Sequence, residues 1–353
     1  MAKFRACVES MTGYVPGESS EDPKIVKLNQ NENRYPPSRK VLAAITSAMP
    51  HLSIYPESTS LGLRRAAADH FRVTPEEVIA SNGSDEMLLM MFQACCDPGV
   101  ETIGFNPSYT FYSTLAAKCN VRYRLIDFEG EFRIPTKLEL TKAKLVFLPN
   151  PNAPTGTLFP EHEIRRIIEA VPDGIVVIDE AYADYSGQTV IPLIREYDNL
   201  MVVRTFSKSY SLAGLRVGLG FANAALLFQL EKVRDFYNLD RLAQAGAEAA
   251  IRDREWLLET TQKIIATRDR TSESVRKLGL KVHDSAANFI LVRFAGPEQA
   301  EKIFFRLREN GILVRYFKTS VIADCLRVSI GTDADMESFL EKLREALPHA
   351  EVI

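Results

Sequence analysis

The segment that most constrains this chain is residues 205–218, which place one lysine among several groups able to bind an anion. The apolar run 200–203 precedes it and is predicted to form a short buried strand. Lys208 follows the end of this strand, where burial disfavours the charged ammonium and favours a nucleophilic amine. An ordinary lysine in a surface loop is the alternative for this segment read on its own.

Groups that suit a phosphate surround this lysine. Thr205 and Ser207 offer hydroxyls, and Arg216, eight residues beyond the lysine, offers a fixed positive charge. An amine that can form a Schiff base, beside a phosphate site, indicates pyridoxal phosphate (PLP).

A second anion site is predicted at Gly83, Ser84 and Asp85. These residues follow a predicted strand and open a predicted helix, a geometry that offers free backbone N–H groups to an anion. The alternative is a simple helix cap, with Ser84 as the N-cap residue.

The size and charge of the chain narrow its class. Its 353 residues exceed what one core usually serves, so a large and a smaller domain are expected. A net charge of −3 without basic blocks argues against nucleic acid or a membrane surface as partners, and no apolar run approaches the roughly 20 residues that span a bilayer. Five cysteines without a paired framework favour free thiols in a reducing cytoplasm, and the scattered histidines show no metal-ligand spacing.

Short apolar runs alternate with helical patterns along most of the chain. This alternation predicts an α/β fold with a mostly parallel sheet, in which ligands bind at the carboxyl ends of the strands. The predicted strands are 78–80, 102–105, 121–126, 145–148, 175–178 and 200–203. Helices rich in leucine and alanine are predicted at 221–250 and 254–278, and a compact α+β unit is predicted after them.

The residues that follow these strands suit the PLP ring. Asp179 is predicted to keep the pyridine nitrogen protonated, as a buried carboxylate does, whereas its neighbour Glu180 is expected to be solvated. Tyr109 offers an aromatic face for the ring, and Tyr182 offers a hydroxyl to the ring oxygen.

Four motifs in a fixed order resemble a known family over nearly the whole chain. They are Asn-Pro-x-x-Pro-Thr-Gly (150–156), Asp-Glu-Ala-Tyr (179–182), Ser-Lys (207–208) and Ala-Gly-Leu-Arg-x-Gly (213–218). Together they are similar to the fold-type I, PLP-dependent aminotransferases, and most similar to the histidinol-phosphate aminotransferases. The resemblance implies a large domain with a mostly parallel seven-stranded sheet and a smaller α+β domain. The expected division is 35–245 for the large PLP-binding domain, with 1–34 and 246–353 forming the N-terminal arm and the small domain.

The resemblance also implies roles for particular residues. Lys208 would bind the cofactor covalently and move the substrate proton, and Asp179 would pair with the pyridine nitrogen. Tyr55 would reach the cofactor phosphate of a neighbouring subunit, which implies a homodimer with shared active sites. The residues implied in substrate binding are Tyr14, Asn33, Arg315 and Arg327.

One position departs from the pattern of the family. Many relatives have an asparagine before the proline of Pro-Thr-Gly, where it bonds the ring oxygen, but here that residue is Ala153. Asn152 is the only nearby substitute, so it is predicted to bind the cofactor in its place.

The resemblance implies a cytoplasmic enzyme of histidine biosynthesis. It would convert L-histidinol phosphate and 2-oxoglutarate into imidazole-acetol phosphate and L-glutamate. The alternatives are an aromatic amino-acid aminotransferase, a threonine-phosphate decarboxylase on the same scaffold, and a PLP-binding effector module without enzymatic activity.

Overall fold

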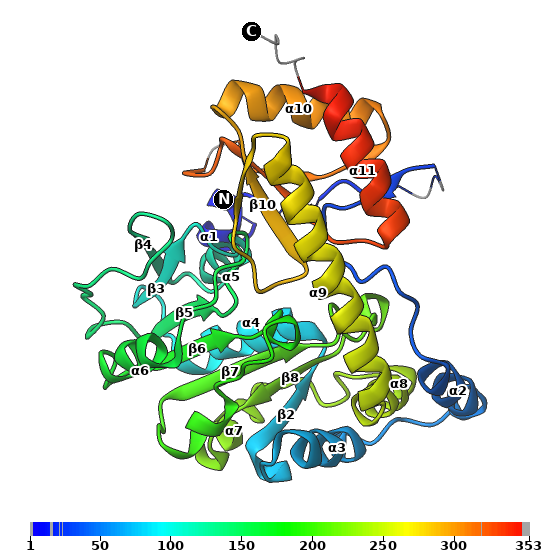
Figure 1. Ribbon diagram of the computed structural model, residues 1–353. Helices are drawn as coiled ribbons and strands as arrows, with labels where there is room; N and C mark the ends of the chain where they lie inside the picture. Colours follow the sequence, from blue (N-terminus) through cyan, green and yellow to red (C-terminus); the bar gives the residue numbers. More distant parts are fainter. Residues whose placement is uncertain (1–2, 15–16, 21, 23, 319, 348–353) are drawn as a thin grey trace, which may run out of the picture.

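The computed structural model describes residues 3–14, 17–20, 22, 24–318 and 320–347, which form a large unit and a smaller unit stacked on it (Figure 1). The large unit contains a seven-stranded sheet, and the small unit contains a four-stranded sheet. None of the helices in the described ranges is long and apolar enough to cross a membrane.

The seven-stranded sheet of the large unit has the order β2-β8-β7-β6-β5-β3-β4. Only β8 runs antiparallel to its neighbours, so the predicted mostly parallel sheet is confirmed. The strands are β2 (Val78–Ser81), β3 (Glu101–Asn106), β4 (Arg122–Asp127), β5 (Leu145–Pro149), β6 (Ile175–Asp179), β7 (Leu200–Thr205) and β8 (Gly218–Phe221).

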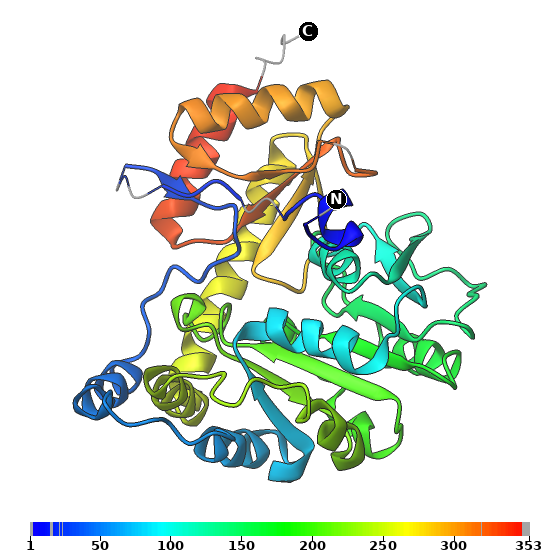
Figure 2. The ribbon, with the colours of Figure 1, turned by 180° about the vertical axis from the view of Figure 1, so that it is seen from behind.

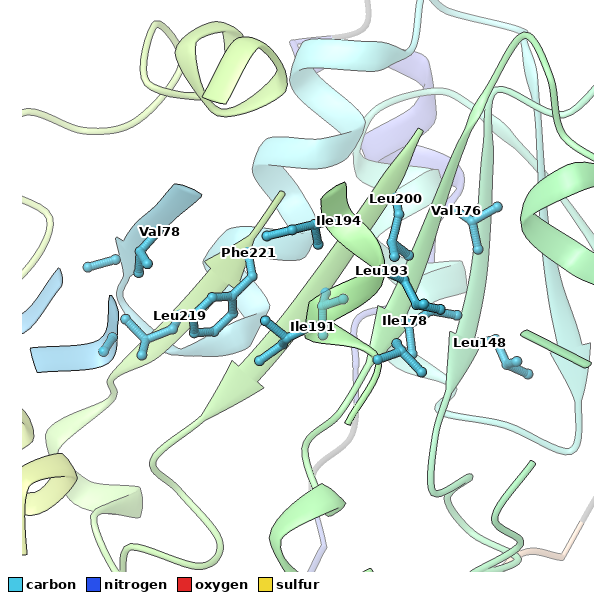
Figure 3. Close-up of a cluster of buried hydrophobic side chains, with 14 of the residues drawn as sticks. Val78, Leu148, Val176, Ile178, Ile191, Leu193, Ile194, Leu200, Leu219 and Phe221 are labelled. Atoms are coloured by element: carbon cyan, nitrogen blue, oxygen red, sulfur yellow. The ribbon is translucent and has the colours of Figure 1, made fainter. Parts of the chain in front are cut away.

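The central strands are buried on both faces, which explains their continuous apolar sequences. On one face, side chains such as Val176, Ile178 and Leu200 pack against Ile191 and Ile194 from the turn after β6 (Figure 3). The opposite face carries a second cluster built with α4 and α5. Because both faces are covered, the carboxyl ends of the strands are the part of the sheet open to a ligand.

Helices surround this sheet. They are α2 (Arg39–Ala48), α3 (Leu61–Phe71), α4 (Gly83–Cys95), α5 (Phe111–Lys118), α6 (Glu161–Glu169), α7 (Ala224–Leu230) and α8 (Arg241–Arg252). Ser38 caps α2 as predicted, because its hydroxyl accepts a hydrogen bond from the backbone N–H of Val41. Ser84 is not an N-cap residue, since α4 already begins at Gly83.

The single helix predicted over 221–250 is wrong. The segment begins with the end of strand β8, continues with α7, and reaches α8 only after turns at 231–240. Phe221 belongs to the strand because it pairs with Val78 of β2 on one side and with Val202 of β7 on the other. Leucine and alanine content alone did not reveal this close contact between strands.

The small unit is reached through α9 (Arg254–Lys277), the long helix that rises from the large unit in Figure 1. Its sheet has the order β12-β13-β10-β9 and is covered by α10 (Pro297–Glu309) and α11 (Asp333–Ala346). The strands are β9 (Lys281–His283), β10 (Phe289–Arg293), β12 (Arg315–Tyr316) and β13 (Cys325–Ser329).

The N-terminal arm contacts both units. α1 (Ala6–Ser10) lies beside α5 of the large unit, and β1 (Val26–Lys27) pairs with β11 (Ile312–Leu313) of the small unit (Figure 2). Between them the arm passes the junction of the two units, so it can supply residues to a site formed there.

We propose a division of the units that differs from the predicted one at residue 245, which falls inside α8. Ala247 and Ile251 of α8 and Leu257 of α9 belong to the core of the large unit. Ile264 and Val275, farther along α9, belong to the core of the small unit. This packing favours a division within α9.

Candidate active site

A cavity of about 410 Å³ opens where the strands of the large sheet end and the small unit begins. It brings together residues from the arm, the large sheet and the small sheet. The predicted site residues that line it are Tyr14, Ser84, Asp85, Tyr109, Asp179, Tyr182, Thr205, Ser207, Lys208, Arg216, Arg315 and Arg327.

Lys208 lies at the centre of these residues, in the loop after β7. Its Nζ donates a hydrogen bond to the backbone carbonyl of Gln30, at 3.0 Å, and lies 5.9 Å from the centre of the Tyr182 ring. The amine therefore points into the cavity, where a carbonyl of the N-terminal arm is its hydrogen-bond acceptor.

Asp179, the last residue of β6, is 5% exposed and sits at the base of the cavity. Burial raises the pKa of its carboxyl to about 6, although hydrogen bonds from the Tyr112 hydroxyl (2.8 Å) and the Ala181 N–H (3.1 Å) act in the opposite direction. Among the described residues Asp179 has no ion-pair partner within 4 Å. Tyr112 was not predicted, because α5 gave no clear pattern in the sequence.

Arg216 also lines the cavity, within a second group of residues that could bind an anion. It donates to the Ser207 hydroxyl at 3.2 Å and lies 3.3 Å from the carboxylate of Asp85. Asp85 in turn accepts a hydrogen bond from the hydroxyl of Tyr109, at 3.2 Å. Gly83 lies behind this group with a φ of +74°, and a methyl group there would be 2.5 Å from the guanidinium of Arg216.

Two arginines of the small sheet line the opposite wall. Arg315 on β12 and Arg327 on β13 are directly paired in the sheet register, and neither forms an ion pair within the described residues. The guanidinium of Arg327 lies between the rings of Phe289 (5.4 Å) and Phe317 (5.7 Å). Burial and the charge of Arg315 lower the pKa of Arg327. In the described part of the chain neither arginine has a carboxylate within 4 Å that would neutralise it.

Comparison with known proteins identifies the family to which the chain belongs. The family model for aminotransferase class I and II matches residues 23–343. The chain belongs to the class I and II aminotransferases.

Individual relatives are similar to this aminotransferase over their full length. The histidinol-phosphate aminotransferase of Clostridium acetobutylicum is 41% identical over 98% of this chain and 100% of its own. That of Geotalea daltonii is 43% identical over 98% and 99%. The solved structure of histidinol-phosphate aminotransferase from Sinorhizobium meliloti in complex with pyridoxal-5'-phosphate has a TM-score of 0.89, 26% identity and 98% coverage of both chains. The fold-type I architecture is thereby established.

The fold is also shared more widely. An L-threonine-O-3-phosphate decarboxylase from Porphyromonas gingivalis has a TM-score of 0.80 at 20% identity, covering 91% of this aminotransferase and 99% of its own chain. Such a likeness shows the fold alone, so the reaction must be argued from the sequence relatives and the site.

Four predicted residues do not line the cavity of the aminotransferase; they are Gly83, Tyr55, Asn33 and Asn152. The side chain of Asn33 donates to the carbonyl of Ser209 at 3.1 Å and accepts from the N–H of Tyr35 at 3.0 Å. Asn152 donates both of its amide hydrogens to protein groups, at 3.0 Å and 2.8 Å, whereas Ala153 lines the cavity. Asn152 therefore does not substitute for the missing asparagine, because its N–H groups are already used in its own loop.

Glu180 is not solvated, contrary to the prediction. It is 2% exposed, and Arg204 of β7 donates to its carboxylate at 2.9 Å. Arg204 also pairs with Asp184, which accepts a hydrogen bond from the hydroxyl of Ser209. This buried network lies directly behind the loop that carries the lysine.

Tyr55 also lies outside the cavity. It is 75% exposed and stacks on Tyr237, with ring centroids 4.5 Å apart. Because most of the side chain is exposed among the described residues, it is available to a second subunit.

The residues of the cavity fit PLP in their chemistry. A protonated pyridine nitrogen would supply the cation that the buried carboxyl of Asp179 lacks. A phosphate would receive hydrogen bonds from Arg216 and Ser207 beside the first turn of α4, where free backbone N–H groups favour an anion.

Proposed function

We propose that this chain is a PLP-dependent histidinol-phosphate aminotransferase. It transfers the amino group of L-histidinol phosphate to 2-oxoglutarate, giving imidazole-acetol phosphate and L-glutamate in histidine biosynthesis. The observation that carries this assignment is the pair of adjacent arginines, Arg315 and Arg327, facing the lysine across the cavity without a carboxylate partner in the described chain. The full-length relatives at 41–43% identity support the same substrate.

Two adjacent guanidinium groups suit a phosphate better than a single carboxylate. A phosphate monoester carries a charge of about −1.5 to −2 near neutral pH and offers several acceptor oxygens. Arg315 and Arg327 together match that charge, and the exposed hydroxyl of Tyr14 beside them adds a donor. The carboxylate of glutamate occupies the same wall in the second half-reaction, since a guanidinium binds either anion through paired oxygens.

Each remaining residue has one task in this reaction. PLP, when bound, supplies an electron sink for the bond that breaks at the substrate carbon. Asp179 holds the proton on the pyridine nitrogen, and Arg216 with Ser207 holds the phosphate. Lys208 would provide the amine that holds the aldehyde of PLP, and its Nζ would also be the group placed to accept the proton from the substrate carbon.

A homodimer with shared active sites is part of this proposal. Exposed apolar side chains gather around Tyr55 on the segments 49–55 and 236–237; they are Met49, Leu52, Ile54, Tyr55, Phe236 and Tyr237. Such a contiguous patch favours an interface, and a second copy of this chain is the expected partner. An equimolar mixture of Lys208→Ala and Tyr55→Phe subunits tests it. Half of the dimers would be hybrids with one intact site out of two, so the mixture would regain about a quarter of wild-type activity.

We also propose a cytoplasmic location. All five cysteines are free, as expected of a protein that works in a reducing compartment.

An absorbance measurement tests the assignment. The protein loaded with PLP is mixed with histidinol phosphate in the absence of any oxo-acid. We expect the band of the lysine-bound cofactor to disappear and the band of pyridoxamine phosphate to rise, and 2-oxoglutarate should then reverse the change. Lys208→Ala should abolish this cycle, and Arg327→Lys should weaken histidinol phosphate binding.

Two other results would favour the rival reactions. Conversion by phenylalanine or tyrosine but not by histidinol phosphate would identify an aromatic aminotransferase. Release of carbon dioxide from threonine phosphate, without any need for an oxo-acid, would identify a decarboxylase.

A further inference from the structure

Three successive residues of the N-terminal arm each bind one functional side chain of the cavity. The carbonyl of Asn29 accepts a hydrogen bond from Arg327 at 2.9 Å, and the carbonyl of Gln30 accepts one from Lys208 at 3.0 Å. The side-chain amide of Asn31 donates to the hydroxyl of Tyr182 at 2.9 Å. Two of these contacts use backbone carbonyls, so Asn31 is the position at which the identity of the side chain matters.

Every polar group of Asn31 is held by the protein. Its backbone N–H donates to the hydroxyl of Ser329, which donates back to its side-chain oxygen, both at 2.9 Å. Its backbone carbonyl accepts from the amide of Asn288 at 2.9 Å. Asn31 is 1% exposed and has a φ of +56°, a conformation in which asparagine is enriched. Because Ser329 takes the side-chain oxygen, the NH₂ group must face Tyr182.

This orientation decides where the proton of Tyr182 points. A tyrosine hydroxyl has one proton to donate and can also accept hydrogen bonds. The bond from Asn31 uses the hydroxyl as an acceptor, and an NH₂ group cannot accept a proton in return. In the described part of the chain the hydroxyl donates to no protein acceptor. Tyr182 lines the cavity, so its proton is free to be donated into it.

We propose that Asn31 is a positioning residue that makes the Tyr182 hydroxyl a donor toward the ring oxygen of the cofactor. The inference rests on the proposed function, because it requires PLP in the cavity. Ala153 makes the role important, since the adjacent wall offers a methyl group and no second donor. Ser329 lies two residues from Arg327 on the same face of β13, so one strand fixes both the anion-binding arginine and the orientation of Asn31.

The absorption of the lysine-bound cofactor as a function of pH tests this role. A donor at the ring oxygen stabilises negative charge there and weakens proton binding at the nitrogen that joins lysine and cofactor. In Asn31→Asp the carboxylate accepts the Tyr182 proton, so the ring oxygen loses its donor and the cavity gains a negative charge. Both effects favour the protonated nitrogen, and we expect the midpoint of the absorption change to rise by about one pH unit or more.

Further variants separate this effect from general disruption. Asn31→Gly keeps the left-handed backbone and removes the amide without adding charge, so it should give a smaller upward shift. Gln30→Glu makes the same change of amide to carboxylate one residue away, where the side chain contacts Gly17 and Lys27 instead of Tyr182. Gln30 also lines the cavity, so the midpoint should rise, but by less than in Asn31→Asp, because only the added charge acts there. The charged side chains that line the cavity with Tyr182 are unchanged in all of these variants; they are Asp85, Asp179, Lys208, Arg216, Arg315 and Arg327.

A double-mutant cycle with Tyr182→Phe completes the test. Without the hydroxyl, Asn31→Asp should shift the midpoint by clearly less than it does in the wild-type background, because only the added charge remains. Equal shifts in both backgrounds, or wild-type midpoints in Asn31→Asp and Asn31→Gly, would overturn the role of Asn31. A wild-type protein that shows no lysine-bound absorption at saturating PLP would instead overturn the proposed function, and this inference with it.

Discussion

In the absence of PLP, replacing Asp179 by asparagine should raise the free energy of unfolding of the protein. With PLP bound, the same substitution should lower it. The carboxyl is buried, has no ion-pair partner within 4 Å among the described residues, and has a pKa raised from 3.8 to about 6. The folded protein therefore binds this proton more tightly than the unfolded chain does. Stability from this group is fully present below about pH 4 and is lost as the pH rises through about 6.

The size of the effect follows from the two pKa values. A rise from 3.8 to about 6 corresponds to about 3 kcal/mol of unfolding free energy. In cofactor-free protein Asp179→Asn should accordingly be more stable than the wild type at pH 7–8, by up to ~3 kcal/mol less the cost of altered hydrogen bonds. The two proteins should become equal near pH 4. With PLP bound the order should reverse, because the aspartate then faces a protonated pyridine nitrogen.

Urea unfolding followed by circular dichroism, from pH 4 to pH 8, measures the pH dependence in the absence of PLP. The same titrations with PLP measure the expected reversal. Tyr112→Phe is the companion variant: it removes a hydrogen bond that lowers the pKa of Asp179, so stability should fall more steeply with pH. If cofactor-free Asp179→Asn kept the pH dependence of the wild type, the buried carboxyl would not be the source of that dependence and the reasoning would fail.

Three further predictions, two of them with a control variant, test the fold and the site. Gly83→Ala and Gly99→Ala should each lower the free energy of unfolding by about 1–2 kcal/mol, because both glycines have positive φ. Only Gly83→Ala should also weaken PLP binding, by about tenfold or more in a fluorescence titration. Arg204→Met should lower the free energy of unfolding in urea by about 3–5 kcal/mol, because it leaves buried carboxylates without a cation. Replacing the more exposed Arg165 should lower it by less than about 1 kcal/mol. Ser38→Ala should lower the melting temperature through loss of a helix cap worth about 1 kcal/mol. An Arg204 variant as stable as the Arg165 variant would contradict the role of the buried network.

Patterns of a few neighbouring residues predicted the centre of the site correctly. A short apolar strand followed at once by a chemically unusual residue placed Asp179 and Lys208 at strand ends, and a mostly parallel sheet brings such ends to one edge. Arg216 was found for the same reason, because its motif is local in the sequence. The cofactor and the aminotransferase family followed from these residues.

The predictions that failed depended on contacts between distant segments. Leucine and alanine content suggested one helix over 221–250, but Phe221 pairs with Val78 and Val202 in the large sheet, so the segment begins in a strand. Glu180 was expected in solvent because acidic residues in loops usually are, yet Arg204 lies 24 positions later and pairs with it. Asn152 was predicted from its neighbour in the sequence, and the folded loop turned its amide away from the cavity.

The sequence by itself determined most of the alternation of strands and helices and the positions of Lys208 and Asp179 after buried strands, because each depends on a few adjacent residues. Only the tertiary structure decided which groups orient them. Tyr112 reaches Asp179 across 67 positions, and Asn31 reaches Tyr182 across 151. The physical reason is that a hydrogen bond requires a donor and an acceptor about 3 Å apart in space. The folded chain brings such pairs together from distant segments, and no local sequence pattern indicates which residues will meet.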